Sequence, residues 1–472
     1  MNKTLSLLLC VLAAFAAEAF AQDKTEIIPY SEYVTTIISS LPEIKSNGVN
    51  VLAQENAVMK AKALSDILIT SNGTLGSTTL MQSGDKYKSN TANVDIGVAK
   101  KFTSTGTYVG ANVGYDRTAI DGLVVQGQSG DSKTFQAPYL RLSVSQPLLN
   151  NFLGKVDSFS EKDAEMQLEV EKVRLLNSNK MTLNAYRKMY FEWVMAMRQI
   201  DNSRESIRNA TTQLNQVRRN YNTGINEEDD YQRAAATLLN YQQSLESNNV
   251  QLRNIERYLA VYLDTSTLKP NSVDFDNLYK EAYASDFVAV DFSKTTSARI
   301  IDLTSDRLMY AKGVFRNNTL PDLNVTGSYT RKNLTNSPSE QFSSFSENDW
   351  RLGFEFVYKL GNNQAEGQLK DIEIQLQALD YERGAAINSY NKNLNSIATS
   401  AQGIKDILNM KAQYLTTLNR QLAAERRKYS QGRLNLSYVI ATENQIAAEK
   451  SNIVNLQYQL ISLYIDYLDA IQ

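Results

Sequence analysis

Two long stretches of the chain lack the residues that break helices. Residues from about Ser158 to Asn222 contain no proline and no glycine, and residues from about Asn363 to Ser430 contain no proline and only three glycines. At 1.5 Å per residue, a helix of about 65 residues would be roughly 100 Å long, whereas an ordinary globular helix has about three turns. The pattern therefore predicts two rod-like helices, each with breaks or bends.

A segment after each rod carries apolar and aromatic residues at a spacing of three and four. In the first segment the positions are Leu238, Tyr241, Leu245, Asn248, Leu252, Ile255, Leu259 and Tyr262, and 208 residues later they are Ile446, Glu449, Ile453, Leu456, Leu460, Leu463, Tyr467 and Ala470. This period is typical of helices packed as a coiled coil, although an ordinary amphipathic helix has a similar pattern. The shared register favours antiparallel coiled coils and an internal two-fold repeat.

The two rods end in matching sequences. Residues 218–224 read RRNYNTG and residues 426–432 read RRKYSQG. A glycine that follows a helix often takes the left-handed conformation, which a residue with a Cβ resists. We therefore interpret both sequences as turns between helices. The residues expected at these turns are Arg218, Arg219, Tyr221 and Gly224 in the first, and Arg426, Arg427, Tyr429, Gly432 and Arg433 in the second.

The clearest strand pattern is WRLGFEFVYKL at residues 350–360. Its apolar face is formed by Trp350, Leu352, Phe354, Phe356, Tyr358 and Leu360. Strict alternation over this length indicates a strand with one apolar face, which a soluble β-sandwich also has. The length suits a tilted strand that crosses a bilayer, and aromatic residues at both ends suit an interfacial girdle. We therefore expect this face to contact lipid.

Further strand patterns lie in both halves of the chain. Two clear strands in each half give four per chain, and an additional hairpin is predicted in the first half only, near residues 94–117, with its turn at Thr103–Gly106. An open sheet edge cannot lie in lipid, and four strands cannot enclose a useful pore. We therefore expect several copies of the chain to close one barrel, and three copies would give twelve strands.

The N-terminus has the features of a secretory signal. Lys3 precedes an apolar run at residues 5–16, and Ala19–Ala21 fits signal peptidase, which predicts a mature start near Gln22. Cleavage would remove Cys10, the only cysteine, and the chain has no histidine. These absences exclude disulfides, thiolate metal sites and imidazole bases. With no paired-acid or phosphate-binding motif in a convincing context, we expect no enzyme, no catalytic residue, no cofactor and no metal site, and the net charge of −2 predicts no nucleic-acid partner.

Several motifs, taken together in their order, resemble the TolC-type outer-membrane efflux proteins, the outer membrane factor family. They are the two turns with tyrosine and glycine described above, SQPLLNN at residues 145–151, LPDLNVTGSY at residues 320–329, and RNIERYLAVYL at residues 253–263. The resemblance covers nearly all of the chain after the signal segment.

This resemblance implies an α+β membrane protein that is a homotrimer. Long antiparallel helices would form a periplasmic α-barrel, and the strands would form a transmembrane β-barrel completed by trimerisation. The protein would be the passive exit duct of a tripartite efflux or type I secretion system. It would lie in the outer membrane, extend into the periplasm, and bind a periplasmic adaptor protein and an inner-membrane pump of the RND or ABC type.

We divide the chain into four parts on these grounds. They are a signal peptide at residues 1–21, a first repeat at 22–264 that includes the additional hairpin, an inter-repeat segment at 265–298, and a second repeat at 299–472. The minimal family pattern lacks the hairpin, which either lengthens the extracellular end or adds strands at that end.

The resemblance places the two helix turns at the periplasmic tip. Only the first turn is followed by acids, at residues 227–230. Acids there can stabilise the free N–H groups of a helix N-terminus. We also expect Asp229 and Asp230 to pair with Arg433, Arg427 or Tyr429 and to hold the entrance closed until adaptor docking. Some family members carry aspartates shortly after the second turn, whereas this chain has Tyr438 and Ala441 there.

Two other classes of protein would explain parts of the sequence. A secreted structural oligomer of coiled coils, without a channel, would explain the helices and the signal segment but not strands of membrane length. A periplasmic carboxylate hydrolase would need an acid pair that the sequence does not show in context. The sequence does not identify the cargo, which could be a drug, a metal or a secreted protein.

Overall fold

The computed structural model describes residues 26–82, 85–121, 124–125, 128–129, 133–224, 226–337 and 343–471, so the predicted signal segment lies outside the described residues. The chain divides into two compact units. The helical unit comprises Met1–Gly48, Leu175–Ala298 and Ala385–Gln472, and the sheet unit comprises Val49–Arg174 and Arg299–Gly384. Each unit is described by itself below.

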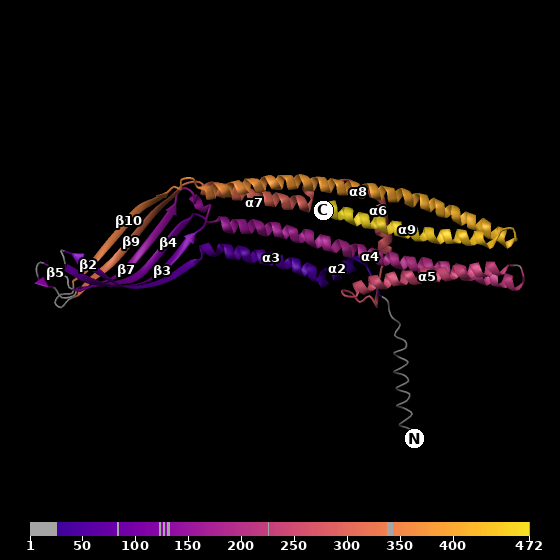
Figure 1. Ribbon diagram of the computed structural model, residues 1–472, viewed down its shortest axis with the longest axis horizontal. Coiled ribbons are helices and arrows are strands. Elements are labelled where there is room, and N and C mark those ends of the chain that lie inside the picture. Colours follow the sequence, from indigo (N-terminus) through magenta and orange to yellow (C-terminus); the bar gives the residue numbers. More distant parts are fainter. Residues whose placement is uncertain are drawn as a thin grey trace, which may run out of the picture. The chain divides into compact units, whose positions relative to one another are not determined.

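The sheet unit contains a six-stranded antiparallel sheet (Figure 1). Its strands are β2 (Ile67–Gln82), β3 (Asp85–Phe102), β4 (Thr107–Asp121), β7 (Lys133–Pro147), β9 (Asp322–Ser337) and β10 (Ser343–Val357). The order across the sheet is β10-β9-β7-β4-β3-β2, which places the β3–β4 hairpin between β7 and β2. Two short strands, β5 (Val124–Val125) and β6 (Gln128–Ser129), form a separate pair.

In two adjacent rows of the sheet, apolar and polar positions are in register across all six strands. Along one row, Ile69, Val98, Ala111, Leu142, Tyr329 and Trp350 are consecutive partners. Along the next row, on the opposite face, the partners are Thr70, Gly97, Asn112, Arg141, Thr330 and Asp349. Because side chains alternate between faces along a strand, the sheet has one apolar face and one polar face.

Helices continue the strands within the sheet unit. Parts of α3 (Pro42–Ala61), α4 (Phe159–Asn222), α7 (Thr296–Asn318) and α8 (Asn363–Ser430) belong to it, with the short helices η1 (Lys62–Ser65) and η2 (Phe152–Gly154). Leu308, Ala311 and Ile372 form a small apolar cluster between α7 and α8. Arg307 of α7 also donates two hydrogen bonds, of 2.7 and 3.0 Å, to the carboxylate of Asp163 on α4.

The helical unit contains the remaining elements. They are α2 (Tyr30–Ser40), α5 (Glu228–Leu259), α6 (Ser272–Ala284), η3 (Phe292–Lys294), α9 (Leu436–Ile471), the remaining parts of α3, α4, α7 and α8, and the parallel strands β1 (Glu26–Ile28) and β8 (Leu268–Pro270). The core is built around fully buried aromatic residues, among them Tyr33, Tyr190, Phe191 and Trp193. Burial of such side chains is the main favourable contribution to folding.

Tyr190 connects three segments of this core. Its hydroxyl lies 2.9 Å from the carbonyl oxygen of Ile28 and 2.9 Å from Oδ2 of Asp274, and it accepts a hydrogen bond of 3.0 Å from the N–H of Asn271. A buried hydroxyl without partners would be costly. These bonds therefore fix β1 and the start of α6 against α4.

The structure agrees closely with the predicted rods and differs in the number of strands. The helices expected from about residues 158 to 222 and 363 to 430 are α4 and α8, which end at Asn222 and Ser430. The count of four strands was wrong, because β3 and β4 pair with β2 and β7 in the same sheet. The strand predicted to reach Leu360 ends at Val357, since the chain turns at Gly361 with a φ of 84°. Within the described residues, none of the helices has the length and hydropathy required to cross a membrane.

Candidate gate at the two helix turns

Gly224 and Gly432 both end a long helix in the left-handed conformation. Their φ angles are 73° and 69°. The N–H of Gly224 donates to the carbonyl of Tyr221 at 3.0 Å, and the N–H of Gly432 donates to that of Tyr429 at 2.9 Å. A Cβ at either glycine would meet nothing within 4 Å. The requirement for glycine is therefore one of backbone conformation and not of space.

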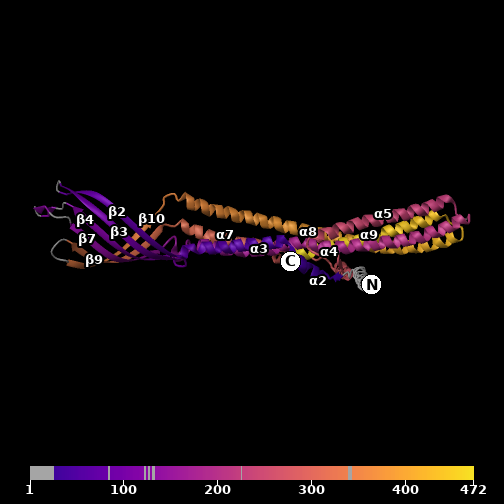
Figure 2. The same cartoon turned by 90° about the horizontal axis from the view of Figure 1, so that it is seen from below.

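The two turns lie side by side at one end of the helical unit (Figures 1 and 2). Beneath them Val217 of α4, Ala234 of α5 and two α9 residues, Leu436 and Ile440, form a buried apolar cluster, and Tyr429 of α8 packs against it. The ring of Tyr221 stacks on Tyr231 with centroids 5.8 Å apart, which closes the first turn. The end of the unit is therefore held by an apolar contact as well as by polar ones.

One polar contact links the two turns directly. The hydroxyl of Tyr429 lies 3.1 Å from Nδ2 of Asn226, and the same Nδ2 donates to Oδ2 of Asp230 at 2.7 Å. Burial raises the pKa of Tyr429, the hydrogen bond from Asn226 lowers it, and the charge of Asp230 adds to the rise. The hydroxyl is thus neutral at physiological pH. The other carboxylate oxygen of Asp230 is buried and has no hydrogen-bond partner in the part of the chain that the structure describes.

The acids of the first turn do not form the predicted ion pairs with the arginines of the second turn. Asp229 forms an exposed ion pair with Arg233, at 3.6 Å, on its own helix. In the second turn, Arg433 donates to Gln431 at 3.5 Å and Arg427 donates to the carbonyl of Ala423 at 3.3 Å. Among the described residues no ion pair joins Asp229 or Asp230 to either arginine.

The remaining predicted residues of the turns fall into two groups. Arg218 and Arg219 are exposed at the end of α4. Arg426 reaches Glu443 of α9 at 2.7 Å, a contact within the second helix pair. Asn226 and Glu443 were not expected from the sequence. Asn226 follows the glycine turn at a position where asparagine is common for local reasons, so nothing in its pattern indicates a contact across the turns.

Polar side chains line the seam between the two helix pairs away from the turns. A groove of about 490 Å³ lies between α4, α5 and α9, and serine, asparagine and glutamine predominate in its lining. Across it Tyr241 of α5 donates to Oδ1 of Asn444 of α9 at 2.6 Å. Elsewhere between α4 and α9, Lys450 contacts both carboxylate oxygens of Glu205 at 2.8 Å. Burial raises the pKa of Tyr241 to about 12.

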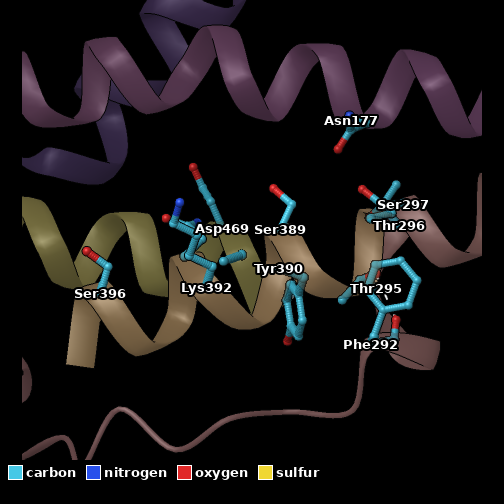
Figure 3. A pocket seen from close by; sticks show the side chains of 13 residues that line it. Asn177, Phe292, Thr295, Thr296, Ser297, Ser389, Tyr390, Lys392, Ser396 and Asp469 are labelled. Atoms are coloured by element: carbon cyan, nitrogen blue, oxygen red, sulfur yellow. Dashed lines mark hydrogen bonds between the residues drawn. The ribbon is translucent and has the colours of Figure 1, made fainter. Parts of the chain in front are cut away.

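A second cavity, of about 600 Å³, lies between α4, α8, α9 and the segment around η3 (Figure 3). Hydroxyl, amide and amine groups such as those of Asn177, Ser389 and Lys392 surround it. The carboxylate of Asp469 at its edge accepts bonds from Asn184, at 2.6 Å, and Arg187, at 3.0 Å. Among the described residues no group of three or more acidic side chains converges as metal ligands.

The predicted lipid-facing residues are exposed in the structure. Trp350 and Phe354 of β10 have 76% and 79% of their surface accessible, and Leu352 and Phe356 are exposed on the same face. Tyr358 and Leu360 are also exposed but follow the end of the strand. Large apolar side chains in such a continuous patch indicate a surface that another apolar phase covers.

The comparisons with known proteins agree with this geometry. Residues 306–465 match the model of the outer membrane efflux protein family, which confirms the resemblance inferred from the sequence. No curated protein matches the chain.

Solved structures show the same fold. CusC, whose structures concern transmembrane channel formation, is 13% identical with a TM-score of 0.64 over 94% of this chain and 91% of its own. VceC, an outer membrane protein of Vibrio cholerae, is 12% identical with a TM-score of 0.61 over 94% and 95%. The MtrE outer membrane channel of Neisseria gonorrhoeae is 12% identical with a TM-score of 0.63 over 94% and 88%. At these identities the likeness concerns the fold.

Proposed function

We propose that this chain is an outer-membrane exit duct, a passive channel of a tripartite efflux or type I secretion system. The observation that carries the proposal is the sheet, whose apolar face is exposed across all six strands while its other face is polar. In a membrane barrel the outer face of the sheet contacts lipid and must be apolar, whereas the inner face lines a water-filled lumen and is polar. The fold shared with outer membrane channels supports the same reading.

A homotrimer completes the channel in this proposal. The sheet has two outer strands, β2 and β10, and an open edge is not stable in hydrocarbon. Pairing β10 of one copy with β2 of the next satisfies both edges and closes a β-barrel. The long helices of three copies would form coiled coils and a periplasmic α-barrel. The chain would comprise a signal peptide at residues 1–21, repeats at 22–264 and 299–472, and an inter-repeat segment at 265–298.

The two helix turns are the proposed gate at the periplasmic tip. The contact of Tyr429 with Asn226 joins the two helix pairs, and the same amide of Asn226 donates to Asp230 within the first turn. Above it the seam is polar and solvated, so separating the pairs there exposes little apolar surface. Adaptor docking at residues 218–224 and 426–433 would replace the contacts between the turns. The inner-membrane pump, of the RND or ABC type, would then drive cargo through the open duct.

Fractionation of cells tests the localisation. We expect the protein in the outer membrane as a trimer, and a strain that lacks it should become sensitive to a subset of antibiotics, detergents or metals, or should lose a secreted protein. Recovery of the protein from the medium as a water-soluble oligomer would instead support the structural coiled-coil protein and would contradict the channel.

A further inference from the structure

The β3–β4 hairpin carries the same division of faces as the strands on either side of it. Val98 and Val113 lie in the rows of the apolar face, while Asn112 lies in a row of the polar face. The two strands have 18 and 15 residues, and a tilted strand needs about 9–11 to cross the hydrocarbon. A hairpin that extended into water would not need an apolar face aligned with the apolar faces of the adjacent strands.

The hairpin is also paired along both of its long sides. β3 pairs with β2 from Asp85 to Lys100, and β4 pairs with β7 from Tyr108 to Ile120. On the polar face the ring of Tyr139 of β7 lies over Gly114 of β4, in space that a Cβ at position 114 would occupy. The hairpin therefore separates β2 from β7 along nearly their whole length.

The turn of the hairpin is fixed to the loop that leads from β7 into α4. Lys101 forms an ion pair of 2.7 Å with Asp157, which also accepts a hydrogen bond of 2.6 Å from Asn151. Gln146 donates to the carbonyl of Thr105 in the turn at 3.0 Å. Gly154, with a φ of 65°, lies so close to the turn that a Cβ there would collide with the carbonyl oxygen of Thr103. The hairpin turn is thus built into the end of the sheet where the helices begin.

We propose that the β3–β4 hairpin is part of the barrel wall, so that three copies close an eighteen-stranded barrel instead of one with twelve strands. This inference rests on the proposed trimeric channel. Because barrel diameter grows roughly in proportion to strand number, the barrel would be about half again as wide as one with twelve strands. Barrels of 16–18 strands enclose an open aqueous channel. The membrane portion would therefore enclose a wider aqueous channel than a twelve-stranded exit.

A single cysteine introduced into a strand can be labelled specifically, because Cys10 is the only cysteine of the chain and lies in the predicted signal segment. The label then reports whether that position faces lipid or water. Val98→Cys and Val113→Cys, labelled with bimane in vesicles of phosphatidylcholine, should be quenched by brominated acyl chains to the same extent as Phe354→Cys on β10. Asn112→Cys, on the opposite face of the hairpin, should be quenched by aqueous iodide instead.

The reference label on β10 separates the two possible failures. If Phe354→Cys is quenched by brominated lipid while Val98→Cys and Val113→Cys are quenched by iodide alone, the hairpin lies outside the hydrocarbon and the inference is wrong, but the channel stands. If none of the three is quenched by lipid, the proposed channel itself is wrong. A map of the purified trimer by electron cryomicroscopy gives an independent count, with eighteen strands expected and twelve contradicting the inference.

Discussion

Tyr429 and Asn226 lie 203 residues apart in the chain, yet the hydroxyl of one is 3.1 Å from the amide nitrogen of the other. The same amide donates to Asp230 at 2.7 Å. Asn226→Ala would leave two half-buried polar groups without this partner, at a cost of about 1–3 kcal/mol. Since about 1.4 kcal/mol changes a population tenfold, we expect a roughly tenfold gain in the open state, seen as a larger and noisier conductance in planar bilayers.

Arg433→Ala is the matched control for this change. Arg433 lies in the same turn as Tyr429, but the hydrogen bond of its side chain stays within that turn. We expect its conductance to equal that of the wild type. An effect of Arg433→Ala as large as that of Asn226→Ala would show that the turns are held by ion pairs, as first expected from the sequence.

Gly224 and Gly432 should tolerate alanine poorly even though they are exposed. Left-handed backbone costs a residue with a Cβ about 1 kcal/mol, so Gly432→Ala should lower the melting temperature of the helical signal in circular dichroism. Gly403→Ala in α8, where a Cβ meets nothing within 4 Å and φ is not positive, should raise it, because alanine favours a helix interior. A melting temperature that Gly432→Ala leaves unchanged would contradict the assigned turn geometry.

The contact of Tyr241 with Asn444 should weaken in alkali. Burial raises the pKa of Tyr241 to about 12, so folding favours the neutral hydroxyl. The corresponding stabilisation is complete below the ordinary pKa of tyrosine, about 10, and is lost as pH rises through about 12. Melting temperatures of the wild type should therefore fall more steeply between pH 10 and 12 than those of Tyr241→Phe. If the melting temperatures of the two proteins fell equally over this pH range, deprotonation of this hydroxyl would not be linked to unfolding.

Gly154→Ala should disrupt the sheet unit much more than a glycine-to-alanine change elsewhere in the sheet. Its Cβ would collide with the backbone of Thr103, and its φ of 65° is unfavourable for alanine. We expect little trimer in the outer membrane fraction of cells that express it. Gly73→Ala in β2, whose Cβ would have one neighbour at 4.0 Å, should assemble normally. Equal yields of the two variants would show that the anchored turn is dispensable.

The rods and turns could be predicted because their signals are local. The absence of proline from 363 to 430 and the glycine at 432 determine where α8 begins and ends, and the structure follows them. Alternation likewise indicated the hairpin at residues 94–117. Its place between β7 and β2 was not predictable, because pairing depends on contacts such as Lys101 with Asp157 that join residues 56 positions apart.

The contacts of the candidate gate were predicted less well for a related reason. Opposite charges in the two turns suggested ion pairs, but exposed side chains pair as easily with their own helix, as Asp229 does with Arg233, and such pairs contribute little. The contact that joins the turns uses an amide and a hydroxyl. Neutral groups carry no charge pattern in the sequence, so only their three-dimensional arrangement reveals them.

Single-channel recording tests the central claim most directly. The purified trimer, inserted into a planar bilayer, should form a stable pore of low conductance, and Asn226→Ala should raise that conductance while Arg433→Ala leaves it unchanged. A protein that inserts into no bilayer and conducts no current in any of these forms would contradict the assignment of this chain as an outer-membrane exit duct.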